Sequence, residues 1–464
     1  MSREIDILNN RLSSRRTVLI LTWPIIVEQL LSMMVNYVDT AMVGSIGVDA
    51  TASIAVVTST IWLIGGLMMG VSVGFSVLVS RAVGYRDFAE AKEIVRQSFL
   101  TMVGFGLIIT LLVEFLIAPF LPGWMGANAS IRQDSVNYFR ITGAVYVFDM
   151  FLFVGGGIIR GAGDSRSPMI YSILNNAVNI VGNFFFIYQP RTIVLFGIPF
   201  RVWGAGLGVS GAALGTAAGA AVCGIMIIHR IFDPDLSVSI SLHDRFRLDR
   251  KIQKQALTLG IPTALERITI SGGQLVVTML ATGLGTSALA AHQLANTAEQ
   301  ICYMPAYSFG VSATTLIAQS LGANRPELAK TYSRDCILDG VILISACAVL
   351  LYIFAPELMG LFIRDAGVIA AGAQVLRIQA LAEPAVGITN VVSGILRGGG
   401  DTVGPFVIGV AGMWVVRITL AVIMIHMFQA GLVGIWIPMA ADWVVRACCC
   451  LLRMRSGKWM HKLD

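Results

Sequence analysis

Charged residues are scarce in this chain of 464 residues: Asp, Glu, Lys and Arg make up 13% of it, whereas an average soluble domain has about 25%. Hydrophobic residues account for 56%. Because so few charges could not cover a soluble surface, the composition predicts a membrane protein with several spans. The net charge of +6 is expected to follow the membrane topology, and we expect no nucleic-acid partner.

Several chemical signatures are also absent. The five histidines are scattered, and no His and Glu pair occurs on one helix as a metal-dependent intramembrane enzyme would need. A Gly-x-x-x-x-Gly-Lys-Ser/Thr phosphate loop is missing, which argues against a primary pump. The seven cysteines have neither metal-ligand nor disulfide spacing. We therefore expect no enzyme activity and no cofactor, so an ion gradient or the substrate's own gradient must supply the energy.

Long apolar runs are what the chain does have. Twelve are long enough to cross a bilayer, which predicts an all-α integral membrane fold. Their approximate limits are 17–40, 52–80, 95–121, 134–159, 168–188, 206–230, 255–282, 287–318, 335–356, 370–396, 405–428 and 431–452.

The distribution of basic residues predicts the orientation. Arg3, Arg11, Arg15 and Arg16 precede the first run, whereas the segments assigned to the outside hold only Arg132, Arg191, Arg201 and Arg364. Since basic residues favour the cytoplasmic side, we expect both termini in the cytoplasm of a multi-pass plasma-membrane protein.

The sequence is also repeated internally. Pro24 and Glu28 recur as Pro262 and Glu266, 238 positions later, and from Arg140, which matches Arg377, the offset is 237. The motif Arg-Gly-x-Gly-Asp-Ser/Thr occurs once in each repeat, at 160–165 and 397–402, and we interpret it as a tight turn between helices. Two six-helix lobes, 1–230 and 255–464 with a cytoplasmic linker at 231–254, are predicted. Because each has an even number of spans, a pseudo-two-fold axis along the membrane normal should relate them.

Polar residues at membrane depth mark the candidate site in the first lobe. The directions of the first, fifth and sixth runs bring Asp39 near Asn179, Asn183 and Thr216, and the two asparagines share a helix face because they are four residues apart. A carboxylate beside amides and a hydroxyl can take up a proton or hold a small cation such as sodium through oxygen ligands. The alternative is a polar cluster that only joins helices.

Further polar and methionine side chains are candidates for lining a substrate cavity: Glu28, Glu266, Asp149, Met33 and Gln293. Intramembrane arginines require counter-charges, so Glu266 could instead pair with an internal cation such as the adjacent Arg267. Arg417 and Asp442, on neighbouring antiparallel runs, are expected to form a structural bridge. Glu299 and Glu383 are other acids at membrane depth in the second lobe.

Together these features resemble multidrug and toxic compound extrusion (MATE) transporters. The resemblance covers the whole chain and includes Pro24 to Asp39, the two Arg-Gly-x-Gly-Asp turns, Ala291-His292-Gln293 and Trp414-Val-Val-Arg417. It implies a V-shaped pair of lobes that exports organic, often cationic compounds against an inward flow of protons or sodium ions.

The resemblance also assigns residues. The family's first-helix carboxylate corresponds to Asp39, its fifth-helix polar pair to Asn179 and Asn183, and its sixth-helix hydroxyl to Thr216. One branch, the DinF type, has an aspartate where this chain has Asn183. Another, the NorM type, uses acids where this chain has Ile270 and Val386, so the coupling ion remains open.

The resulting expectation is a secondary active multidrug efflux antiporter. It would export cationic amphipathic compounds in exchange for H⁺ or Na⁺ and function as a monomer in the lipid bilayer. A lipid or lipid-linked-glycan flippase of similar two-lobe architecture is the alternative.

Overall fold

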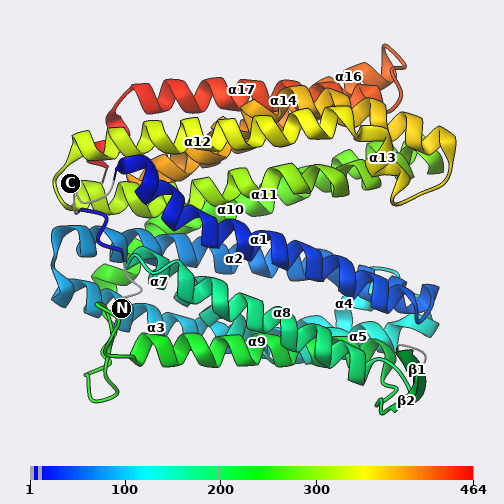
Figure 1. Cartoon of the computed structure of the whole chain (residues 1–464), viewed down its shortest axis with the longest axis horizontal. Coiled ribbons are helices and arrows are strands. Elements are labelled where there is room, and N and C mark those ends of the chain that lie inside the picture. Colours follow the sequence, from blue (N-terminus) through cyan, green and yellow to red (C-terminus); the bar gives the residue numbers. More distant parts are fainter. Residues whose placement is uncertain (1–4, 9–12, 196–197, 463–464) are drawn as a thin grey trace. The chain divides into compact units, whose positions relative to one another are not determined.

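The computed structural model describes residues 5–8, 13–195 and 198–462, and its described part is almost entirely helical (Figure 1). Arg3 and Arg11, used above to predict the orientation, lie outside the described residues. Two compact units can be distinguished. Unit 1 contains Val27–Val79 and Phe88–Lys254, and unit 2 contains Asp6–Ile26, Ser80–Asp87 and Gln255–Asp464. The first two helices thus contribute residues to both units.

Unit 1 contains the larger part of two long helices, α1 and α2, and ends with a pair of helices that pack along each other, α8 and α9 (Figure 1). Between these two, a small hairpin pairs Arg191 with Val202 and Leu195 with Ile198. The elements are α1 (Ser14–Gly44), α2 (Val48–Tyr85), α3 (Phe88–Leu112), the π-helix η1 (Val113–Ile117), α4 (Ala118–Trp124), α5 (Ala129–Gly143), α6 (Tyr146–Met150), the π-helix η2 (Phe151–Gly155), α7 (Gly156–Gly161), α8 (Arg166–Phe186), β1 (Arg191–Leu195), β2 (Ile198–Val202) and α9 (Gly208–Phe232).

Unit 2 is built around α11 and α14, which pack against each other and both contact α12. Its hydrophobic core includes Val277, Trp436 and Met359. The elements are α10 (Arg250–Gly283), α11 (Thr286–Gly322), α12 (Pro326–Ile353), α13 (Ala355–Gly360), α14 (Ala366–Gly398), α15 (Val403–Ala411), the π-helix η3 (Gly412–Ile418), α16 (Thr419–His426), α17 (Val433–Arg455) and the 3₁₀-helix η4 (Lys458–His461).

Each of the twelve predicted runs falls in helical structure. Within the described residues, eight helices are long and apolar enough to cross a membrane, and nine if the pair Ala129–Gly143 and Tyr146–Gly161, bent by 51°, counts as one span. The polar helices α8, α10 and α14 are not among the eight. The protein is therefore helical with several candidate spans, whereas the twelve-span arrangement and the axis between the lobes stay predictions.

A π-helix explains why the repeat offset changes. The offset is 238 at Lys92 and Lys330 but already 237 at Ala118 and Ala355. The π-helix η1, which begins at Val113, lies between these positions, and a π-turn accommodates one additional residue within a continuing helix. We therefore place the inserted residue of the first repeat in η1.

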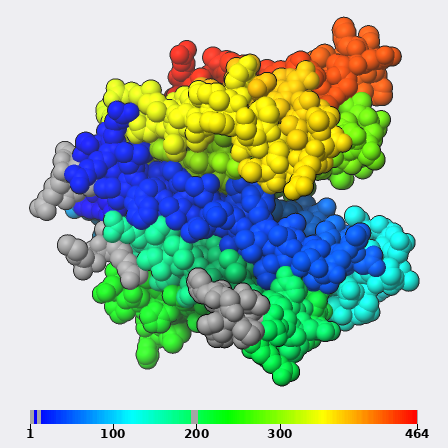
Figure 2. Space-filling view, turned by 45° about the vertical axis from the view of Figure 1, so that its right-hand side comes forward, coloured from blue at the N-terminus to red at the C-terminus, as the bar shows by residue number. Residues whose placement is uncertain are grey.

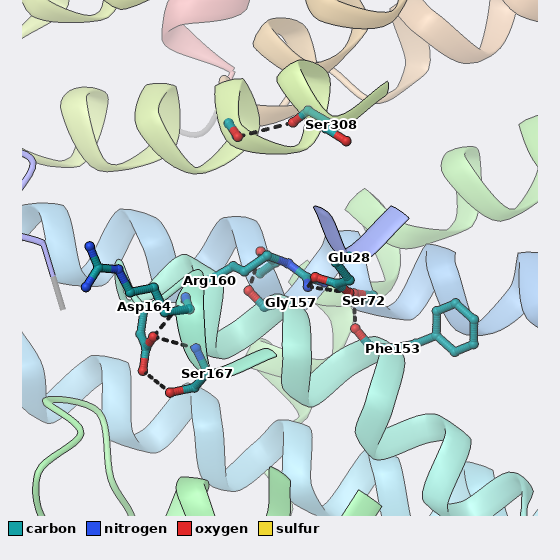
Figure 3. Close-up of polar contacts among 11 residues, drawn as sticks. Glu28, Ser72, Phe153, Gly157, Arg160, Asp164, Ser167 and Ser308 are labelled. Atoms are coloured by element: carbon teal, nitrogen blue, oxygen red, sulfur yellow. Dashed lines mark hydrogen bonds and ion pairs between the residues drawn. The ribbon is translucent and has the colours of Figure 1, made fainter. Parts of the chain in front are cut away.

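The two Arg-Gly-x-Gly-Asp motifs form similar turns, as predicted. Gly163 and Gly400 adopt φ angles of +100° and +88°, which glycine tolerates because it lacks a Cβ atom. Asp164 then accepts hydrogen bonds from the first backbone N–H groups of α8, at 3.1 Å from Arg166 and 2.9 Å from Ser167 (Figure 3). Such bonds satisfy donors that have no partner within the helix.

The carboxylates of both turns also bind an arginine from the last turn of a later helix. Arg230 Nη2 of α9 donates to Asp164 at 3.0 Å, and Arg453 Nε of α17 donates to Asp401 at 2.7 Å. The motif therefore closes the turn and attaches it to the helix that ends each repeat.

Glycines let the last turns of α2 and α11 approach closely within unit 2. A Cβ atom at Gly84 would overlap the carbonyl oxygen of Gln319, and one at Gly322 would overlap that of Arg81. Both glycines lie within helices, while the left-handed residues that follow are Arg86 and Asn324, with φ angles of 59° and 56°. The repeat-related glycines are thus contact points between helices.

We predict that Gly84→Ala and Gly322→Ala each destabilise the protein. The added methyl group meets a backbone oxygen that cannot rotate away, and overpacking of this kind costs about 1–3 kcal/mol. Thermal unfolding in detergent measures the effect. Gly65→Ala, also in α2, is the matched control because its Cβ atom would meet nothing within 4 Å. Unfolding of both variants at the wild-type temperature would contradict the prediction.

Candidate coupling site

The structure brings the four predicted residues of the first lobe together. Asn183 Nδ2 donates to Asp39 Oδ1 at 2.7 Å and to Asn179 Oδ1 at 3.2 Å. Asn179 Nδ2 in turn donates to Thr216 Oγ1 at 3.1 Å. Three helices therefore meet in one hydrogen-bonded chain, with Asp39 on α1, the asparagines on α8 and Thr216 on α9.

Small residues make this meeting possible. Gly182 on α8 faces Gly215 on α9, so that a Cβ atom on Gly182 would lie 2.9 Å from the Cα atom of Gly215. Membrane helices use such residues to bring backbones close together. Asn179 and Asn183 lie on the same face because they are one turn apart. The close approach of α8 and α9 thereby brings Thr216 within reach of Asn179.

One buried acceptor of this hydrogen-bonded cluster has no partner among the residues that the structure describes. The Oδ1 atom of Asn183 makes no hydrogen bond in the described part of the protein, and the residue is fully buried. The side chain of Asp39 is half-buried, and no arginine or lysine of the described residues forms an ion pair with it. The site thus combines a carboxylate that lacks a counter-charge with a free amide oxygen, which is chemistry suited to a proton or a sodium ion.

Glu28 lies on the same helix but forms an ion pair. Arg160 Nη1 lies 3.2 Å from Glu28 Oε1 and 3.1 Å from Oε2, and both side chains are mostly buried (Figure 3). Two serines of α2 hold the helical segment that carries this arginine: Ser72 donates to the carbonyl oxygen of Phe153 at 2.7 Å, and Ser76 to that of Gly157 at 3.0 Å. The arginine of the first turn motif therefore supplies the counter-charge of Glu28.

The second repeat contains the equivalent pair. Arg397 Nη2 lies 3.0 Å from Glu266 Oε1 and 2.8 Å from Oε2. Arg267, which we had considered as the partner, instead places its guanidinium 5.4 Å from the ring centroid of Tyr307. The partner of Glu266 is thus the arginine of the second turn motif, as it is for Glu28 in the first repeat.

The predicted bridge between Arg417 and Asp442 is confirmed, with Arg417 Nε donating to Asp442 Oδ2 at 2.9 Å. A second arginine, which was not predicted from the sequence, joins this bridge. Arg446 donates to both oxygens of the same carboxylate, at 2.6 Å and 2.7 Å. Its position four residues after Asp442 on α17 was the available signal.

Two acids of unit 2 share one amide. Gln379 Nε2 donates to Glu299 Oε1 at 2.8 Å and to Glu383 Oε1 at 3.3 Å. Gln379 Oε1 and Glu383 Oε2 are buried and make no hydrogen bond with a described residue. Both acids were candidates in the sequence, but the glutamine that joins them was not, although Gln379 precedes Glu383 by one helical turn.

The remaining cavity candidates are dispersed. Asp149 is half-buried on α6, Met33 is 7% exposed on α1, and Gln293 is exposed on α11. Within the described residues, no hydrogen bond joins any of them to the Asp39 cluster. Their role in binding a substrate stays a prediction.

Comparison with known proteins gives a consistent result. The family model described as MatE matches the chain twice, at residues 24–185 and 262–423, and both matches start and end 238 positions apart. A "Probable multidrug resistance protein NorM" of Thermotoga maritima is 26% identical and covers 96% of this chain and 93% of its own. An "Uncharacterized transporter YisQ" of Bacillus subtilis is also 26% identical, with 95% and 94% covered.

Solved structures share the fold. A crystal structure of MATE in complex with MaL6 has a TM-score of 0.89 at 24% identity and covers 97% of this chain and 98% of that chain. An outward-facing multidrug resistance MATE family transporter of the MOP superfamily has a TM-score of 0.87 at 23% identity, with 97% of both chains covered. Since the family matches extend over more than half of the residues, the chain belongs to the MatE family of membrane transporters.

Proposed function

We propose that this protein is a secondary active multidrug efflux antiporter that exports organic, cationic amphipathic compounds in exchange for protons or sodium ions. It would act as a monomer in the plasma membrane, with both termini in the cytoplasm. The family membership and the names of the relatives support export. The observation that carries the proposal is the Asp39 carboxylate on α1, which accepts a hydrogen bond from the neutral amide of Asn183.

Antiport requires the ion and the substrate to favour different conformations, because a ligand that binds two states equally shifts nothing. Asp39 meets this requirement since its charge can change. Protonation would convert one of its oxygens from an acceptor into a donor, and Asn183 carries an unused acceptor close by. Sodium, when bound, would neutralise the carboxylate, and Asp39, Asn179 and Asn183 are the residues that would supply its oxygen ligands.

Helix α1 would transmit the change. Pro24 removes one backbone hydrogen bond from α1 and allows it to bend there. Residues up to Ile26 belong to unit 2, and those from Val27 belong to unit 1. An altered bond between Asp39 and α8 would therefore act on a helix that both units share.

Glu28, Glu266, Asp149, Met33 and Gln293 are proposed to contribute to substrate binding. For the two glutamates, the ion pairs with Arg160 and Arg397 support a structural role as well. The shared amide of Glu299 and Glu383 makes these acids the second candidate for ion coupling, to be considered if Asp39 is dispensable.

We predict that Asp39→Asn folds and still binds substrate but loses gradient-driven export by about tenfold or more, as expected for a coupling free energy of 1–3 kcal/mol. Export of ethidium from proteoliposomes under a proton gradient or a sodium gradient, each imposed alone, measures the effect. Binding of ethidium to the purified protein shows whether recognition survives.

The combined change Asp39→Asn with Asn183→Asp is the matched control. It keeps one carboxylate and one amide in the pair that is now 2.7 Å apart, so we expect partial recovery of coupled export. If Asp39→Asn exports ethidium at the wild-type rate with unchanged ion dependence, the coupling role would instead be assigned to Glu299 and Glu383. Lipid translocation without ethidium export would favour the flippase.

We also predict that Glu28→Gln and Glu266→Gln lower protein yield and unfolding temperature. Each leaves a mostly buried arginine without its counter-charge, and breaking a buried pair costs about 3–5 kcal/mol. Thermal unfolding of Glu28→Gln, Arg160→Gln and the double variant measures the interaction free energy, and the double variant should be more stable than Glu28→Gln alone.

Export assays test the substrate role of the two glutamates. If they bind cations directly, their glutamine variants should export cationic compounds less well than neutral ones. Equal losses for both classes, with a stability change that the double variant reverses, would show that the glutamates serve only as partners of the arginines.

A further inference from the structure

An apolar groove of about 310 Å³ runs between α12 and α14 of unit 2. Ser345, Val349 and Tyr352 line it from α12, at the i, i+4 and i+7 positions of one helix face, and Leu381 and Pro384 line it from α14. Val349 is 57% exposed and Leu381 is 77% exposed. An exposed apolar face of this kind is suited to contact with lipid tails in a membrane protein. Figure 2 shows this part of the chain, coloured yellow to gold, at the surface.

A positive charge is fixed at one end of the groove. Arg377, one turn before Leu381 on α14, donates through Nε to the carbonyl oxygen of Tyr352 at 3.3 Å, and its Cζ atom lies 5.6 Å from the centroid of the Tyr352 ring. Tyr352 is the residue before the end of α12 at Ile353. The guanidinium is exposed and forms no ion pair with a described carboxylate. An uncompensated arginine therefore marks the end of an apolar groove.

The equivalent arginine of the first repeat has a carboxylate beside it. Arg140, which matches Arg377, lies 3.8 Å from Glu114, a residue of the π-helix η1. The second repeat has no such insertion, and the positions opposite Glu114 are Leu351 and Tyr352. The second repeat has thus kept the arginine but has no carboxylate beside it.

We propose that the groove binds an anionic phospholipid, with its phosphate on Arg377 and an acyl chain between α12 and α14. The planar guanidinium matches the geometry of phosphate oxygens. The bond from Nε to the backbone holds the side chain in place and leaves its Nη atoms available. The groove continues from this end of α12 along the same helix face to Ser345, seven residues or about 10 Å along the helix axis, in the direction that a lipid tail would take.

Native mass spectrometry of the purified full-length protein tests this site. It compares the retention of phosphatidylglycerol, which is anionic, with that of phosphatidylcholine, which is zwitterionic. The wild type should retain one phosphatidylglycerol in preference to phosphatidylcholine. Arg377→Gln should weaken this retention about tenfold, the order expected for losing a charge-assisted hydrogen bond. Arg140→Gln is the matched control and should retain the lipid like the wild type, because Arg140 already has Glu114 as its ion-pair partner.

Two further variants distinguish binding of the lipid headgroup from binding of its acyl chain. Tyr352→Glu supplies a carboxylate next to Arg377 and should remove the preference for phosphatidylglycerol while leaving the arginine in place. Ala348→Phe, which fills the groove at one of its lining residues, should weaken retention of both lipids. The rise of the unfolding temperature with added phosphatidylglycerol gives a second readout and shows that each variant is folded.

Arginine and tyrosine also occur as simple anchors at the membrane interface, and an anchor would not distinguish the two lipids. Equal retention of both lipids by the wild type would therefore overturn the proposal. Retention of phosphatidylglycerol by Arg377→Gln at the wild-type level would overturn it as well.

Discussion

Buried charges need partners in a chain with so few polar residues, and this constraint organises the protein. Breaking a buried ion pair costs about 3–5 kcal/mol, a large part of the stability of most domains. Arg160 therefore binds Glu28, Arg397 binds Glu266, and Arg417 and Arg446 share Asp442. The first two pairs connect the first helix of each repeat to the arginine of its turn motif. Asp39 differs from all of these carboxylates because its hydrogen-bond partner is a neutral amide.

Comparison of the two repeats separates scaffold from function. The glutamate–arginine pairs, the positive-φ glycines of the turns and the closely packed glycines of α2 and α11 recur at matched positions. The Asp39 cluster does not recur. The two family matches start and end 238 positions apart. At this offset Asp39 corresponds to Val277 and Asn183 to Ala421, and both of these residues are fully buried in unit 2. The features that both repeats share support the fold. The polar cluster occurs in only one repeat, so it is the better candidate for a functional role.

Local spacing and helix direction were sufficient to predict the Asp39 cluster. Asn179 and Asn183 share a face, and runs of known direction limited which residues could meet at one depth. The partner of Glu266 could not be predicted in this way. Arg267 is its neighbour in sequence, but adjacent residues on a helix point in different directions, and Arg397 is 131 positions away. Only the folded structure, in which Arg397 of α14 reaches Glu266 of α10, brings the two side chains together. Gln379 was missed for a different reason: it lies only one helical turn from Glu383, but a neutral side chain gives no charge signal in the sequence.

The free energies of the two interactions on α1, at Glu28 and at Asp39, indicate which of them can change during a transport cycle. Glu28 and Asp39 are eleven residues apart, about 16 Å along the helix axis. Releasing Glu28 from Arg160 would cost about 3–5 kcal/mol, more than the 1–3 kcal/mol by which bound ligands typically influence each other. A hydrogen bond to a charged group contributes about 1.5–3 kcal/mol, which lies within that range. The bond from Asn183 to Asp39 is therefore weak enough for an ion to control, while the pair at Glu28 holds the rest of the helix in place. A helix fixed at one point and reversibly bonded at another can respond to an ion without losing its fold.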